Sequence, residues 1–253
     1  MPEHPEEVYA GDYFTGASQG FGYTDYDVDK QPMVPTFKTY LERIGRYTAP
    51  GEGKKMLDVG AATGFFLNLA REAGWETAGI EPSVSAAQLA REQKKLDVRA
   101  GLLEPGVYAP GSFDVITLWD VIEHVPDPVG FSRLVHDLLK PGGVYAINTP
   151  DASSLYGRAM GEKWHALCPP EHLTLFTNEA LDQLLAASGF QMLERGKIGK
   201  SFTVQYIFQT LGHWQKSKIL FSLSQGLSKI GVGGISIPLN LRDNVFLLAR
   251  KAS

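Results

Sequence analysis

The chain lacks the features that mark secreted, membrane-spanning and nucleic-acid-binding proteins. It has a single cysteine, Cys168, in 253 residues, so a disulfide within the chain and a cysteine metal cluster are both excluded. No run of about eighteen apolar residues occurs, which argues against a membrane-spanning helix. The net charge is −4 and no long basic run is present, which argues against nucleic acid as the main partner. The acidic, polar N-terminus is unlike a signal peptide, so we expect a cytoplasmic protein.

What the chain does contain is the pattern of an α/β domain. Hydrophobic residues make up 43% of the sequence, enough for a sizeable core in a chain of this length. Between residues 54 and 150, apolar runs alternate with helix-spaced segments, which predicts a mostly parallel sheet with right-handed crossovers. We expect strands at 56–60, 77–81, 97–100, 113–119 and 144–148, and helices at 64–73, 82–93 and 128–139.

Two segments fall outside this alternation. Residues 1–49 are expected to form an N-terminal arm and helix, which either packs its aromatic residues on the domain or acts as a lid over a ligand. Residues 50–253 are expected to form one domain that ends in strands near 190–198 and 244–250. Between those strands we expect a helical insertion at about 199–240, packed on the sheet, on a second subunit or against a hydrophobic acceptor.

The most informative stretch is Leu57-Asp58-Val59-Gly60-Ala61-Ala62-Thr63-Gly64, a buried strand that breaks at glycine and re-enters a helix. Glycines at such a turn let a ligand contact bare backbone at the carboxyl edge of a sheet. The spacing is neither G-x-G-x-x-G nor that of a P-loop, which disfavours dinucleotides and nucleoside triphosphates. Glu81 ends the next expected strand, where its carboxylate can accept both hydroxyls of a ribose.

Residues 54–198, with the strand at 244–250, resemble the class I S-adenosylmethionine-dependent methyltransferases, above all the bacterial group related to the ubiquinone-biosynthesis O-methyltransferases. Besides the glycine turn, the resemblance is carried by Gly79-Ile80-Glu81-Pro82, Phe113-Asp114-Val115-Ile116, Val121-Ile122-Glu123-His124-Val125-Pro126-Asp127-Pro128 and Leu138-Leu139-Lys140-Pro141-Gly142-Gly143. It implies a Rossmann-like α/β fold with helices on both faces of a seven-stranded, mostly parallel sheet whose last strand is antiparallel. Ala62 replaces the middle glycine of the family's turn, and we expect its φ to be negative.

The resemblance also implies S-adenosylmethionine as the cofactor and S-adenosylhomocysteine as its product. The backbone of the turn is expected to approach the methionyl carboxylate and the ribose. Trp119 and Asp120 are expected to face the methionyl end, and Leu102 to meet the adenine edge, where the family often has an acid. The residues predicted to bind the cofactor are Asp58, Gly60, Ala61, Ala62, Gly64, Phe65, Glu81, Pro82, Leu102, Trp119 and Asp120.

The acceptor side is expected to need a base. Methyl transfer is an in-line displacement in which the protein mainly aligns the reactants, but an oxygen or nitrogen acceptor also loses a proton. His172 is the preferred base, followed by His124 and, more weakly, His165; each of them can instead be a structural histidine. No spacing of histidines and carboxylates typical of a metal site is present, so we expect no metal.

The predicted function is S-adenosylmethionine-dependent methyl transfer to an oxygen of a small molecule such as a sugar, a phenol or another secondary metabolite. The apolar insertion leaves a lipid-linked acceptor open, and the chain is expected to act as a monomer or a homodimer. Two alternatives remain open: a binding module that kept the fold without turnover, and a nicotinamide-dependent oxidoreductase on a similar sheet.

Overall fold

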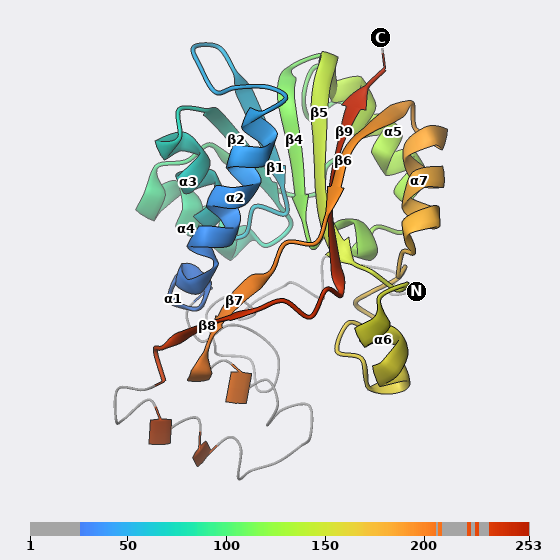
Figure 1. Ribbon diagram of the computed structural model, residues 1–253. Coiled ribbons are helices and arrows are strands. Elements are labelled where there is room, and N and C mark those ends of the chain that lie inside the picture. The colour runs from blue at the N-terminus through green and yellow to red at the C-terminus, as the bar shows by residue number, and fades with distance from the viewer. Residues whose placement is uncertain (1–25, 206, 209–221, 224–225, 228–232, 253) are drawn as a thin grey trace.

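A central β-sheet organises the chain in the computed structural model, which describes residues 26–205, 207–208, 222–223, 226–227 and 233–252 (Figure 1). The order of its strands is β3-β2-β1-β4-β5-β9-β6. Strands β1 to β5 pair in parallel, whereas β9 is antiparallel to both of its neighbours, β5 and β6. The expected seven-stranded sheet is therefore confirmed. Its strands are β1 (Lys55–Val59), β2 (Glu76–Glu81), β3 (Val98–Ala100), β4 (Phe113–Trp119), β5 (Leu139–Pro150), β6 (Phe190–Gly196) and β9 (Asn244–Lys251).

Helices cover both faces of the sheet because successive strand residues point to opposite sides. Met56 and Val115 pack with α2 (Val34–Gly45) and α3 (Phe65–Glu72) on one face. Their neighbours Leu57 and Ile116 pack with α5 (Pro128–Leu138) and α7 (Asn178–Ala187) on the other. Burying each such aliphatic side chain stabilises the fold by about 1.5–3 kcal/mol. Helix α4 (Val84–Lys94) packs its alanines against Leu67 and Val98.

Helices α4, α5 and α7 begin at residues whose side chains cap them. Thr177 accepts a hydrogen bond from the backbone N–H of Ala180 and starts α7. Ser83 caps α4 in the same way through Ala86, and Asp127 caps α5 through Gly130. Each of these caps satisfies a backbone donor that the first helical turn would leave unpaired.

The sequence Lys140-Pro141-Gly142-Gly143 is the one place where the expected sheet needs correction. It reads as a turn before a strand at 144, yet β5 already begins at Leu139. Phe113 pairs with Leu139 and Val115 with Val144, so the register shifts across this segment, as in a bulge. The ammonium of Lys140 donates to Asp114 Oδ2 at 2.6 Å and helps to hold the irregular segment beside β4.

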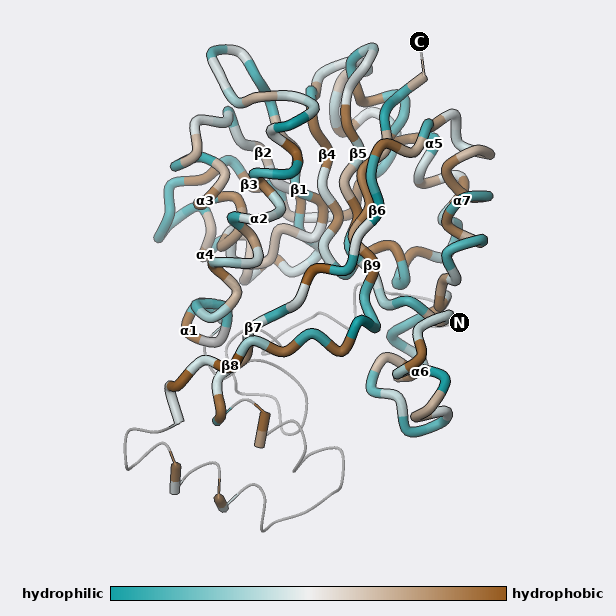
Figure 2. The backbone as a smooth tube through the Cα atoms, in the orientation of Figure 1, coloured by the Kyte–Doolittle hydropathy of each residue, from teal (hydrophilic) through white to brown (hydrophobic). Residues whose placement is uncertain are grey.

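Two smaller parts lie beyond the carboxyl ends of the parallel strands (Figure 1). One is α1 (Tyr26–Lys30) with the short helix η3 (Gln31–Met33); the other is a ribbon of the antiparallel strands β7 (Lys200–Thr203) and β8 (Ser236–Leu239). Hydrophobic and polar residues alternate along β8 (Figure 2). The ribbon forms the described ends of the segment 199–240, whereas most of its predicted helical centre, and residues 1–25, lie outside the described residues.

Three short helices, η4 (Ile122–His124), α6 (Leu155–Met160) and η5 (Gly161–Lys163), complete the described elements. None of the helices in the described ranges combines the length and the apolar character that crossing a bilayer requires.

Candidate active site

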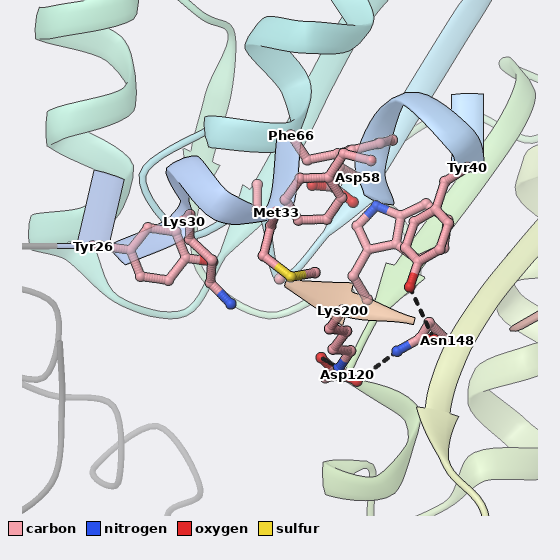
Figure 3. Close-up of a pocket in the computed structure, with 13 residues that line it drawn as sticks. Tyr26, Lys30, Met33, Tyr40, Asp58, Phe66, Asp120, Asn148 and Lys200 are labelled. Carbon is pink, nitrogen blue, oxygen red and sulfur yellow. Dashed lines mark hydrogen bonds and ion pairs between the residues drawn. The ribbon is translucent and has the colours of Figure 1, made fainter. Parts of the chain in front are cut away.

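A pocket lies at the carboxyl ends of β1 and β4, and we call it the switch-point pocket (Figure 3). The strand order reverses here, because the chain builds β2 and β3 on one side of β1 and then β4 and β5 on the other. Open α/β sheets bind their ligands at such points. The pocket brings together five of the residues predicted to bind a cofactor: Asp58, Gly60, Ala61, Trp119 and Asp120.

The turn after β1 has the backbone conformation that its glycines suggest. Gly60 and Gly64 have φ values of +73° and +75°, in the left-handed region that glycine adopts most easily. A Cβ on Gly60 would come within 2.7 Å of Val121, and one on Gly64 within 2.5 Å of Leu96. The glycines therefore allow both the conformation of the turn and its close packing. The backbone of Gly60 lines the pocket.

Ala62 corrects the sequence-based expectation. Its φ is +48°, not negative, so an alanine occupies the left-handed region at a cost of about 1 kcal/mol. A backbone hydrogen bond helps to offset this strain, because the N–H of Ala62 donates to Glu81 Oε2 at 2.8 Å. Local sequence alone cannot reveal the conformation, since the partner lies on the next strand.

Glu81 ends β2 and is only 3% exposed. Its Oε1 accepts from the N–H of Ser83 at 2.9 Å, and its Oε2 accepts from Ala62. Burial raises the pKa of this carboxyl, while the two backbone donors lower it. Because each carboxylate oxygen can accept a second hydrogen bond, Glu81 is held in place and can still receive two ligand hydroxyls.

Asp58 is 2% exposed at the floor of the pocket. Its Oδ1 accepts a hydrogen bond from Thr117 Oγ1 at 2.6 Å. Burial raises its pKa to about 8, an effect that Thr117 opposes and the nearby Glu81 reinforces. At neutral pH this residue is therefore mostly a neutral acid, which can donate as well as accept a hydrogen bond.

Asp120 follows β4 with a φ of +55° and supplies a carboxylate to the pocket. Its Oδ1 accepts from Asn148 Nδ2 and its Oδ2 from Lys200 Nζ, both at 2.7 Å (Figure 3). Burial opposes this charge, but Lys200, with Lys30 and Asn148, keeps the pKa of Asp120 below its usual value. Sequence reasoning did not find Asn148 or Lys200, because neither belongs to a motif near the turn.

The N-terminal elements form an aromatic wall of the switch-point pocket. Tyr40 stacks near Trp119 with ring centroids 4.6 Å apart, and its hydroxyl donates to Asn148 Oδ1 at 3.1 Å. Tyr26, Lys30 and Met33 reach the pocket from α1 and η3 (Figure 3). Asp27 on α1 also accepts a hydrogen bond from Thr63 Oγ1, which ties this segment to the glycine turn. The arm thus contacts the site through residues 26–40.

Several residues of the predicted set lie outside the switch-point pocket. Leu102 is 42% exposed on the loop after β3, while Pro82 precedes the cap of α4. Phe65 is buried in the core against Phe37, and its neighbour Phe66 is the one that lines the pocket. Whether these residues bind a cofactor stays a prediction.

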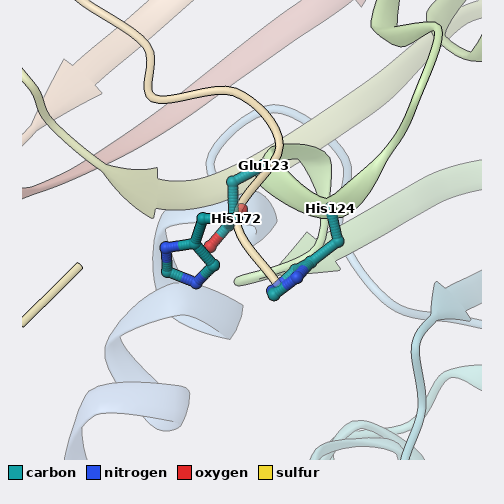
Figure 4. Close-up of side chains that lie close together, drawn as sticks. All are labelled: Glu123, His124 and His172. Carbon is teal, nitrogen blue, oxygen red and sulfur yellow. The ribbon is translucent and has the colours of Figure 1, made fainter. Parts of the chain in front are cut away.

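The two preferred histidines meet near a buried acid, and we call Glu123, His124 and His172 the Glu-His cluster (Figure 4). The two imidazole rings lie 4.7 Å apart in an edge-to-face arrangement. Nδ1 of His124 is 2.8 Å from the carbonyl of Glu171, and Nδ1 of His172 is 2.6 Å from that of Ala166. In a neutral imidazole this contact places the proton on Nδ1 and the acceptor lone pair on Nε2.

Glu123 is fully buried in this cluster. Thr149 Oγ1 donates to its Oε2 at 2.9 Å, whereas its Oε1 has no hydrogen-bond partner among the described residues. Burial raises the pKa of Glu123 to about 8, and the charge of Asp120 adds to this shift. Burial also lowers the pKa of His124 to about 4, with the neighbouring His172 as a second cause. His124 is therefore a neutral imidazole at neutral pH.

One imidazole nitrogen of each histidine and a carboxylate oxygen of Glu123 lie within 4.8 Å of one another, so the cluster offers three potential ligand atoms for a divalent cation. The expectation of no metal was drawn from spacing along the chain. It could not take account of His172, which the fold brings across from a loop 48 positions after His124. The absence of a metal stays a prediction.

His165, the third candidate base, and Cys168 lie beside this cluster. His165 Nε2 is 3.6 Å from Asp243 Oδ2, and burial lowers its pKa. Burial likewise raises the pKa of the Cys168 thiol, which disfavours the thiolate that a nucleophile needs. The structure gives neither residue an evident chemical role.

Comparison with known proteins identifies the family of this chain. A family model described as a methyltransferase domain matches residues 36–195. A curated relative, a ubiquinone biosynthesis O-methyltransferase of Ruegeria pomeroyi, is 29% identical over 157 residues. That match covers 58% of this chain and 63% of the relative, so this chain spans less than two thirds of the relative's length.

Solved structures of similar shape support the fold. Phosphoethanolamine N-methyltransferase 2 of Haemonchus contortus, in complex with S-adenosyl-L-methionine, has a TM-score of 0.58 at 18% identity and covers 95% of this chain and 59% of its own. The cyclase SpnF has a TM-score of 0.56, also at 18% identity, and covers 85% of this chain and 81% of its own. At such identities the likeness concerns the fold alone.

Proposed function

Because this chain belongs to the methyltransferase-domain family, whose model matches residues 36–195, we propose that it transfers a methyl group from S-adenosylmethionine to an oxygen of a small molecule. The observation that carries the proposal is the convergence at one sheet edge of a glycine turn, the ribose-type acceptor Glu81 and a pocket that contains Asp58 and Asp120. Each feature alone is weak evidence, but together they match the parts of one ligand.

The residues of the site fit the cofactor part by part. Glu81 is fixed by two backbone donors and keeps acceptor capacity for the ribose hydroxyls. Gly60 presents only backbone to the pocket, because its φ of +73° and the collision that a Cβ would make with Val121 both require glycine. Asp120 supplies a carboxylate for the methionyl ammonium. When bound, S-adenosylmethionine supplies an electrophilic methyl group on its sulfonium.

On the acceptor side, His172 is the residue we propose as the base. A neutral His172 that donates from Nδ1 to the carbonyl of Ala166 presents Nε2 as a proton acceptor. His124 is held in the same way, but its pKa of about 4 makes it a weak base at neutral pH. We assign His124 the secondary role of orienting the acceptor hydroxyl.

We propose a phenol as the acceptor. Relatives with sequence similarity are named for ubiquinone biosynthesis, and a phenolic hydroxyl gives up its proton more readily than a sugar hydroxyl does. A sugar, another secondary metabolite and a lipid-linked acceptor are the further candidates. The acceptors to screen first are therefore catechols and other substituted phenols.

A methyltransferase-fold binding module without turnover is the second candidate, because the fold alone does not fix the activity: SpnF, which shares it, is named as a cyclase. The test has two stages. Calorimetry with S-adenosylhomocysteine, with NADH as the competing ligand, measures cofactor identity. Mass spectrometry of an acceptor panel incubated with S-adenosylmethionine then measures transfer. Binding with a mass gain of one methyl group in a phenol supports the proposal, and binding without any methylated product supports the second candidate.

A further inference from the structure

Of the described residues in the insertion between β6 and β9, Lys200 lines the switch-point pocket. Strand β7 begins at Lys200, and its partner β8 returns the chain toward β9. Gly199, just before β7, accepts a hydrogen bond through its carbonyl from Thr36 Oγ1 of α2 at 2.9 Å. The start of β7 is thus fixed against the aromatic wall, and the Lys200 side chain lines the pocket beside Asp58 and Asp120.

The ammonium of Lys200 is positioned for more than a surface ion pair. It lies 2.7 Å from Asp120 Oδ2, and its side chain is only 18% exposed. The other oxygen of Asp120 is held by Asn148, which is itself held by the hydroxyl of Tyr40 (Figure 3). An ammonium has three donors, and among the described residues Asp120 is the one hydrogen-bond partner of Lys200. Two donors remain for a ligand.

The pocket therefore places the carboxylate of Asp120 beside the ammonium of Lys200 at the end of β4, among aromatic side chains, while Lys30 of α1 contributes a second cation to the lining. An α-amino acid group carries an ammonium and a carboxylate, which complement the carboxylate of Asp120 and the ammonium of Lys200. We propose that Lys200 and Asp120 together bind the amino acid end of S-adenosylmethionine, with Lys200 contacting its carboxylate and Asp120 its ammonium. This inference rests on the proposed function and adds that the insertion supplies part of the cofactor site.

Charge-assisted hydrogen bonds in partly desolvated sites are strong enough to measure. Removing the ammonium of Lys200 takes away the partner of the carboxylate and leaves the adenosine contacts at Glu81 and the glycine turn intact. The loss should therefore depend on whether the ligand has an amino acid end. 5′-Methylthioadenosine shares the adenosine and thioether of S-adenosylhomocysteine but lacks that end, so it serves as the matched probe.

The experiment compares the affinities of both probes for the full chain by isothermal titration calorimetry. We expect Lys200→Met to weaken S-adenosylhomocysteine about tenfold and to change 5′-methylthioadenosine by less than twofold. Lys163→Met removes the same charge from an exposed position on η5, outside the pocket, and should leave both affinities unchanged. Lys200→Gln, with thermal melts of all variants, provides a second test if Lys200→Met folds poorly.

The other outcomes separate the two proposals. If neither probe binds the wild-type chain, the proposed function itself fails. If both probes bind the wild-type chain, three results for Lys200→Met and Lys200→Gln would overturn the inference. These are an equal loss of affinity for both probes, unchanged affinities, and tighter binding of S-adenosylhomocysteine. Each would mean that Lys200 does not contact the amino acid end.

Discussion

The switch-point pocket and the Glu-His cluster are neighbours, but they are built in different ways. Beside the first, the turn from Gly60 to Gly64 lies 17 to 21 positions before Glu81, and backbone N–H groups fix the carboxylate. In the second, Glu123 lies on η4 and His172 on a distant loop, and the backbone N–H groups of Leu173 and Thr174 join the two segments by donating to the carbonyl of Glu123. The fold fixes the shape of a site that is built from backbone groups and short motifs. A site built from side chains on separate segments can change its chemistry through a few substitutions.

This difference predicts that the two regions separate functionally. Variants in the switch-point pocket should change cofactor affinity, and variants in the Glu-His cluster should change turnover or stability with the cofactor affinity intact. Substitutions in the two regions test this separation, and the proposed base should show the largest effect.

Replacing the proposed base should have the largest effect. His172→Gln should lower kcat on a phenolic acceptor by about 100- to 10,000-fold, because the variant lacks the base that takes the proton of the acceptor hydroxyl. The affinity for S-adenosylhomocysteine should change by less than twofold. Steady-state kinetics and calorimetry check the two expectations, with His165→Gln as the control histidine. Near-normal turnover of His172→Gln at every pH would remove the residue from the mechanism.

Replacing the ribose acceptor should give the opposite pattern. Glu81→Gln removes the charge but keeps the shape, and we expect S-adenosylhomocysteine to bind about 10- to 100-fold more weakly. Glu76→Gln, at the exposed start of the same strand, should bind it as the wild type does. Calorimetry measures both. An unchanged affinity of Glu81→Gln would show that the acid only supports the turn at Ala62.

Glu123 should make stability depend on pH. Its pKa is about 8 in the folded protein against an ordinary 4.5, so the folded state holds a proton that the unfolded chain releases between these values. This contribution to stability is present below pH 4.5 and is lost as the pH rises through 8. Glu123→Gln should therefore gain about 3–4 kcal/mol relative to wild type between pH 5 and pH 8.

Urea unfolding at the two pH values measures this gain, and Glu104→Gln is the exposed control. If the difference between wild type and Glu123→Gln is the same at both pH values, the acid is not protonated in the fold. A large rise in wild-type stability on adding Zn²⁺, absent in Glu123→Gln, would instead indicate a cation in the cluster.

The smallest effect is expected at the strained alanine. Ala62→Gly relieves a left-handed φ and adds chain entropy to the unfolded state, for a net gain of about 0.5 kcal/mol. Lys95→Gly relieves a φ of +56° at the end of α4, outside the pocket, and should give a gain of similar size. Thermal melts compare the two, and S-adenosylhomocysteine affinity should be unchanged in both. A loss of stability in Ala62→Gly would contradict the strain at this position.

The same comparison explains how far sequence could predict this protein. The alternation of strands and helices and the glycine turn follow from local patterns, because apolar periodicity and turn residues stand in consecutive positions. The seven-stranded sheet with its antiparallel last strand was expected from the family resemblance. The conformation of Ala62 and the bulge at Lys140–Gly143 could not be predicted, since the acceptor of each hydrogen bond lies on a neighbouring strand. Lys200 and Asn148 were missed because only the fold brings them to Asp120.

Calorimetric titration of the wild-type chain with S-adenosylhomocysteine and, separately, with NADH tests the central proposal most directly. The account predicts saturable binding of S-adenosylhomocysteine, abolished or strongly weakened by Glu81→Gln, and no binding of NADH. Tight binding of NADH without any binding of S-adenosylhomocysteine would contradict it.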